Sequence, residues 1–157
     1  MGLYQRILVP VDGSEPAGRS LDEALALAAD QGAALKLITV VDEAIGDYMG
    51  GELAWIDPQT LRENLVRGAR KVLDAALEKA QRANLPTESE LIESPEGRIG
   101  RAILKAAEEW QADLLVIATH GRHGLSRLLL GSTTEALLRK GSLPMLVVPS
   151  GASTKQP

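Results

Sequence analysis

Cysteine is absent from the 157 residues of this chain. The protein therefore forms no disulfide bond, and it offers neither a thiol for catalysis nor a thiolate ligand for a metal ion. A chain without disulfides is typical of a reducing compartment, so we expect a cytoplasmic protein.

Aromatic residues are also scarce, since they make up 3% of the chain and phenylalanine is missing. Nucleic-acid surfaces are basic, and those for single strands also stack bases on aromatic rings. This chain instead has a formal net charge of −4 and a pI near 5.2. We therefore expect no nucleic-acid partner.

Long apolar runs are missing as well. No stretch of about 18 uncharged apolar residues, the length that a membrane-spanning helix needs, occurs in the sequence. Residues 1–13 lack the apolar core of a signal peptide, and we expect no membrane partner. The composition, with 45% hydrophobic residues, suits one globular domain, which we place at residues 1–149, followed by a flexible tail at residues 150–157.

Short runs rich in branched apolar residues predict five β-strands. They cover Arg6–Val11, Leu35–Val41, Ser89–Ser94, Leu114–Ala118 and Met145–Pro149. Most of these runs are almost continuously apolar, which is typical of strands buried on both faces of a parallel sheet. The third run is more polar, so we expect it at an edge.

Segments with helical spacing of apolar residues alternate with these strands. The sequence therefore predicts an α/β fold: a single Rossmann-like doubly wound domain with a five-stranded parallel sheet in the order 3-2-1-4-5 and helices on both faces. In such a sheet the connections reverse direction between the first and fourth strands. Ligands bind at this switch point, so the loops after these two strands are expected to border the site.

The loop after the fourth strand ends in GSTTEALLRK, residues 131–140. Ser132, Thr133 and Thr134 are expected in the first turn of a helix, where backbone N–H groups lack internal acceptors and attract anions. Gly131 would let a phosphate approach the backbone closely. The same sequence also suits an ordinary helix N-cap, so both interpretations remain open.

Other residues near the switch point admit similar alternatives. Asp12 follows the first strand, where it would either accept a hydrogen bond from a ribose hydroxyl or form the turn in DGSEP. His120 and His123 lack a third ligand for a metal ion, and we identify no catalytic residue. The chain contains neither G-x-x-x-x-G-K-[ST] nor a G-x-G-x-x-G after the first strand, so fast ATP hydrolysis is not expected.

These residues resemble the universal stress protein family. The family pattern is G-x2-G-x9-G-[ST], whose second half is reproduced by Gly121, Gly131 and Ser132. The stretches ILVPVDGSEPA, VVDE and GSTTEALLRKGSLPMLVVP are also similar to the family. The resemblance implies a stress-response protein that binds ATP or AMP, with or without magnesium, and forms a homodimer through its last strand.

The resemblance also implies a set of binding residues. Pro10, Val11 and Asp12 would border the adenosine, with Asp12 near the ribose, and Val40 would meet the adenine through its backbone. The phosphates would be held by Gly121, Gly131, Ser132, Thr133 and Thr134.

Ala118 departs from the family pattern because it stands where the first glycine is expected. If the position needs a left-handed backbone, alanine costs about 1 to 2 kcal/mol, or roughly a factor of 5 to 30 in affinity. If it needs only a close approach to the ribose, a methyl group is tolerable.

Three functions remain in view. The first is a regulatory nucleotide-binding protein that acts on an unknown protein partner. The second is a dimeric adaptor that works without nucleotide, for which Ala118 is the best support. The third is a slow nucleotide hydrolase.

Overall fold

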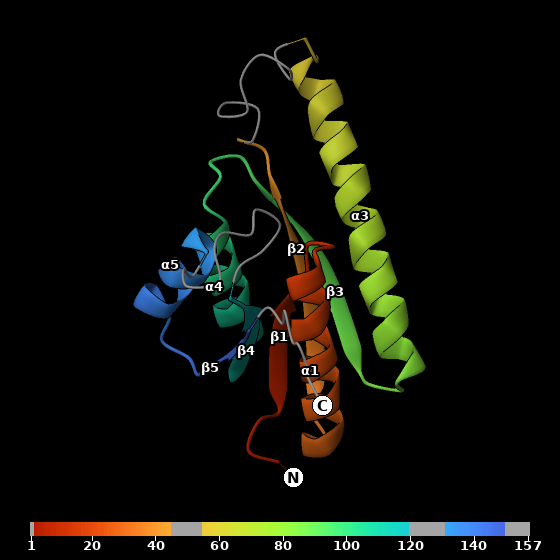
Figure 1. Ribbon diagram of the computed structural model, residues 1–157, viewed down its shortest axis with the longest axis vertical. Coiled ribbons are helices and arrows are strands. Elements are labelled where there is room, and N and C mark those ends of the chain that lie inside the picture. The colour runs from red at the N-terminus through yellow and green to blue at the C-terminus, as the bar shows by residue number, and fades with distance from the viewer. Residues whose placement is uncertain (1, 45–54, 120–130, 150–157) are drawn as a thin grey trace, which may run out of the picture.

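The computed structural model describes residues 2–44, 55–119 and 131–149. Its sheet has five parallel strands in the order β3-β2-β1-β4-β5, which confirms the predicted fold (Figure 1). The strands are β1 (Arg6–Pro10), β2 (Ala34–Asp42), β3 (Thr87–Ser94), β4 (Leu114–Ala118) and β5 (Met145–Val148). The helices are α1 (Glu15–Gln31), α3 (Pro58–Arg82), α4 (Ile99–Trp110) and α5 (Ser132–Lys140).

The predicted strand bounds agree with the observed ones to within two residues. The third strand begins earlier than predicted, at Thr87, because it pairs with β2 along its whole length from Leu35 to Asp42. Its polar residues place it at an edge, as predicted.

The sheet is covered on both faces. Helices α1 and α3 pack on one face, and α4 packs on the other with α5 beside it. Alternate residues of β1 feed the two sides of the core: Ile7 and Val9 pack towards α1 and α3, whereas Leu8 packs towards α4 and α5. All three side chains are fully buried, which explains the continuous apolar run of this strand.

The helices begin in two different ways. The first two are capped by side chains: Ser14 Oγ accepts a hydrogen bond from the Ala17 amide at the start of α1, and Asp57 accepts one from the Thr60 amide at the start of α3. Helices α4 and α5 follow Arg98 and Gly131, and neither has a side-chain cap. Their first amides are therefore left to other acceptors.

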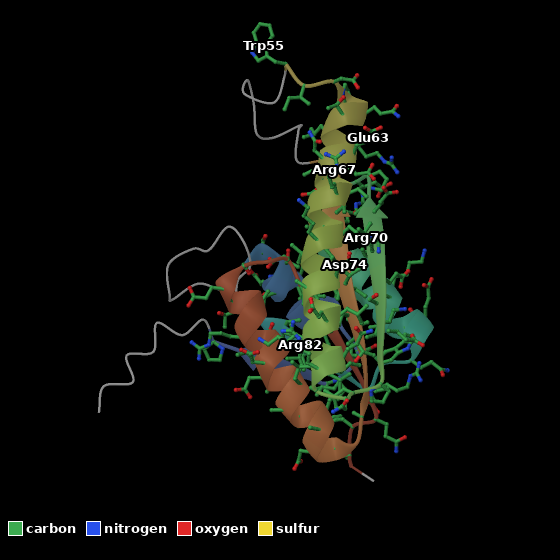
Figure 2. All side chains as sticks on the ribbon, turned by 90° about the vertical axis from the view of Figure 1, so that its right-hand side faces the viewer. Trp55, Glu63, Arg67, Arg70, Asp74 and Arg82 are labelled. Carbon is green, nitrogen blue, oxygen red and sulfur yellow. The ribbon has the colours of Figure 1, made fainter. Side chains whose placement is uncertain are left out.

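Helix α3 extends beyond the carboxyl ends of the strands that it covers (Figure 1). Its buried residues, Leu73, Ala76 and Ala80, all lie in its second half, whereas Leu65 in the first half is only partly buried. Figure 2 shows the charged outer face of this helix, and Trp55, which precedes it, is 91% exposed. No described helix has both the length and the apolar character needed to span a membrane.

Candidate functional site

The candidate site lies at the carboxyl ends of β1 and β4, where the strand order reverses direction. The end of β1 is fixed against β2, because the Val11 amide donates to the Ile38 carbonyl at 2.8 Å. The buried Thr39 hydroxyl donates to the Val11 carbonyl at 3.0 Å. Pro10, Val11 and Asp12 are thereby held beside the end of β2, which carries Val40.

Asp12 forms the turn that the DGSEP sequence predicts. Its Oδ1 atom accepts a hydrogen bond of 2.9 Å from the Ser14 amide, and the residue is partly buried. A carboxylate has about four acceptor positions, so this turn is compatible with a further hydrogen bond to a ribose hydroxyl. Asp12 therefore forms the predicted turn, and this turn does not exclude the predicted contact with a ribose hydroxyl.

The start of α5 is fastened to the end of β4. The Gly131 amide donates to the Thr119 carbonyl at 2.8 Å, and the Thr134 hydroxyl donates to the Ala118 carbonyl at 2.7 Å. The Thr119 amide in turn donates to Val148 of the neighbouring strand. These bonds bring Ala118 together with residues 131–134, although the predicted phosphate residue Gly121 lies outside the described residues.

Two donors that we expected to face a phosphate therefore have other partners. The Gly131 amide and the hydroxyl of Thr134, which is 5% exposed, both bond to protein carbonyls. The remaining donors are the amides of Ser132, Thr133 and Thr134. The first bond within the helix is donated by Glu135 to Gly131, and no described residue accepts a hydrogen bond from those three amides. At the start of this helix, the donors left for an anion are thus the helix amides rather than the Gly131 amide.

Ala118 has an ordinary extended backbone at the end of β4. Among the described residues other than glycine, only Asn84 and Gln111 have a positive φ. The left-handed conformation that would have strained an alanine is therefore not required here. Any effect of Ala118 on a ligand comes from the space that its methyl group occupies.

The described residues contain no group of three or more histidine, aspartate or glutamate side chains that would hold a metal ion. One neighbouring element, the first turn of α4, was not among the predicted binding residues. Gly97, Arg98 and Arg101 line a hollow together with Ser132 and Thr133. In the sequence, this start of α4 corresponds to the stretch EGRIGR, which places two arginines at a helix start that has no side-chain cap.

The architecture and this site define a class: doubly wound α/β domains with a ligand site at the switch point of the sheet. Within that class, the profile described as "Universal stress protein family" matches residues 3–149. The chain therefore belongs to the universal stress protein family.

Individual relatives agree with this assignment. Universal stress protein MJ0531 of Methanocaldococcus jannaschii is 30% identical over 146 residues, which cover 93% of this chain and 82% of the relative. The solved structure of hypothetical protein MJ0577 superposes with a TM-score of 0.81 at 25% identity, covering 96% of this chain and 99% of that one. A universal stress protein solved in complex with cAMP has a TM-score of 0.66 at 25% identity, covering 94% of this chain and 98% of that one.

Proposed function

We propose that this protein binds ATP or AMP at the switch point and works as a regulatory protein of the universal stress type. The observation that carries the proposal is the open first turn of α5, where the amides of Ser132, Thr133 and Thr134 have no acceptor among the described residues. A phosphate at this position would receive hydrogen bonds from these amides and favourable interaction with the helix dipole.

The adenosine would lie between the loop after β1 and the end of β2. Pro10, Val11 and Asp12 would border it, Asp12 would accept from the ribose, and the Val40 backbone would meet the adenine. Gly121, Gly131, Ser132, Thr133 and Thr134 would surround the phosphates, with Ala118 close to the ribose. A universal stress protein has been solved in complex with cAMP, and this supports a nucleotide as the ligand.

Calorimetric titration of the purified protein with ATP and with AMP, each with and without magnesium, tests the proposal. We expect saturable binding, and we expect Asp12→Ala to weaken it about tenfold, because a hydrogen bond to a charged group contributes about 1.5 kcal/mol or more. Asp74→Ala is the matched control, since Asp74 is exposed on the outer face of α3 (Figure 2). If the wild-type protein binds neither nucleotide, the proposal fails.

The Ala118 backbone bears on the rival function, an adaptor that needs no nucleotide. That function was favoured by the alanine at the first motif position. The extended conformation of Ala118 removes the argument from a strained left-handed backbone and leaves only the space that its methyl group occupies. Among the described residues of the candidate site, we assign none as a nucleophile or a general base. We therefore expect regulatory binding in the cytoplasm, with turnover slow or absent.

We also propose a homodimer formed through β5. This strand ends the sheet, and its Leu146 is a large apolar residue that is 38% exposed. Leu138 of α5 is 43% exposed. An open apolar edge strand promotes association between sheets, so soluble proteins usually cover it.

A further inference from the structure

A hollow of about 420 Å³ lies between α4 and α5. Three cationic residues line it: Arg98 at the N-cap of α4, Arg101 within α4 and Lys140 at the end of α5. None of the described residues that line it is acidic. The whole chain carries a net charge of −4, so this concentration of positive charge is local. A cavity of this charge is suited to an anion.

The helix starts add further donors to the same hollow. Ser132 and Thr133 line it from the first turn of α5, and Ile99 and Gly100 line it from the first turn of α4. Both helices lack a side-chain cap, and the first bond within α4 is donated by Ala102 to Arg98. In the part of the chain that the structure describes, the hollow is therefore bordered by the first turns of two uncapped helices as well as by cations.

Helices α4 and α5 pack closely against each other beside the hollow. A Cβ atom added to Gly100 would lie 3.5 Å from the Cβ of Ala136 and 3.8 Å from the carbonyl oxygen of Thr133. Because glycine has no side chain, α4 approaches the first turns of α5 closely at this point. Arg101, in the next position along α4, lines the same hollow as Ser132 and Thr133.

The cations of the hollow are available to a ligand. No ion pair within the described residues involves Arg101 or Lys140. Arg98 lies 3.5 Å from Glu96, but both side chains are more than half exposed, and such pairs contribute little. By contrast, Lys105 and Arg139 pair with Glu109 and Glu135 and do not line the hollow.

We infer that this hollow binds the terminal phosphates of a nucleoside di- or triphosphate whose first phosphate lies at the start of α5. The inference rests on the proposed function, because Ser132 and Thr133 belong both to the proposed nucleotide site and to the lining of the hollow. Arg98 and Arg101 would form charge-assisted hydrogen bonds with phosphate oxygens that AMP does not have. The protein therefore prefers ATP to AMP, and α4 determines that preference.

Calorimetric titrations of the full chain with ATP, AMP and inorganic tripolyphosphate test the inference. The wild-type protein is expected to bind ATP at least about tenfold more tightly than AMP, because each added charge-assisted contact contributes a factor of this order. Arg101→Gln and Lys140→Gln should each raise the Kd for ATP about five- to tenfold and leave the Kd for AMP within about twofold. The matched controls, Lys105→Gln on α4 and Arg139→Gln on α5, should change neither.

The outcomes separate this inference from the proposed function. If AMP binds and ATP binds no more tightly, or if Arg101→Gln weakens both equally, the inference is overturned while the proposed function stands. If neither nucleotide binds, the proposed function fails. Tripolyphosphate that binds as tightly as ATP would identify a site for free phosphate chains and overturn the assignment to a nucleotide. Thermal unfolding of each variant verifies that the fold is retained.

Discussion

The hydroxyl of Thr134 donates a hydrogen bond of 2.7 Å to the carbonyl oxygen of Ala118. This contact joins the first turn of α5 to the end of β4 across sixteen positions of sequence. The position of the helix start, and with it the direction of its open amides, therefore depends on a threonine that sequence reasoning had assigned to the ligand.

Replacing Thr134 with valine preserves the volume of the side chain and removes the donor. Since the side chain is 5% exposed, the carbonyl of Ala118 would lose a buried partner, and we expect the free energy of unfolding to fall by about 1 to 3 kcal/mol. Urea denaturation measures this change. Thr133→Val is the control, because no described residue is a partner of the Thr133 hydroxyl, and an equal loss in both variants would contradict the role of the bond.

Ala118→Gly examines the departure from the family pattern. The backbone of Ala118 is extended, so glycine relieves no strain there. We expect the variant to lose about 0.5 to 1 kcal/mol of stability, because glycine weakens a strand interior. The Kd for ATP should change by less than the roughly 5- to 30-fold that release of a left-handed backbone would give. A gain in that range, measured by titration, would show that the methyl group obstructs the ligand.

The sequence predicted the fold well because its signals are local. The runs around Leu8 and Val116 are apolar at consecutive positions, as strands buried on both faces require, and the polar third run reached the edge. Ser14 caps the start of α1 and Gly32 ends it at a φ of 66°, and both residue types are typical local signals of a helix end. Each of these features depends on neighbouring residues and on the general rules for parallel sheets.

The site was predicted less completely because some of the hydrogen-bond donors expected to face a ligand donate to acceptors within the protein instead. Whether the Gly131 amide faces a ligand depends on the position of the Thr119 carbonyl, which no local pattern specifies. The approach of α4 to α5 at Gly100 is likewise a tertiary contact, so the hollow that Arg101 and Ser132 both line could not be read from their spacing. Tertiary geometry decides which of several polar residues remain available.

Leu73→Ala and Leu65→Ala compare the two halves of α3. Leu73 is fully buried, so its replacement leaves a cavity, and we expect a loss of about 2 to 5 kcal/mol. Leu65 is only partly buried on the half that extends beyond the sheet, and its replacement should cost less than about half as much. Urea denaturation of both variants measures the difference. Similar losses would mean that the first half of α3 is as well packed as the second.

The proposed dimer is tested by placing a charge on β5, the strand through which the two copies would pair. Leu146→Glu should convert the protein to a monomer at micromolar concentration, because an unpaired carboxylate would be buried in the interface. Light scattering or sedimentation measures the mass. Leu3→Glu is the control, since Leu3 is 80% exposed and precedes β1 rather than lying on β5. A wild-type protein that is already a monomer would contradict the dimer itself.

Asp12 offers a test of the ribose contact that separates it from the turn. Asp12→Asn retains a side-chain oxygen that can accept from the Ser14 amide, so the turn and the stability should be preserved. The neutral amide accepts a weaker hydrogen bond from a ribose hydroxyl than the carboxylate does. The wild-type protein should therefore bind ATP about tenfold more tightly than 2′-deoxy-ATP, and Asp12→Asn should reduce that ratio to about two or three.

The comparison works as a double-mutant cycle, since 2′-deoxy-ATP lacks the donor of the bond and Asp12→Asn weakens its acceptor. Titration of both proteins with both nucleotides gives the coupling directly. If the wild-type protein and Asp12→Asn prefer ATP over 2′-deoxy-ATP by the same factor, the 2′-hydroxyl donates to an acceptor other than Asp12. Asp12 would then act only through the turn that it forms with Ser14.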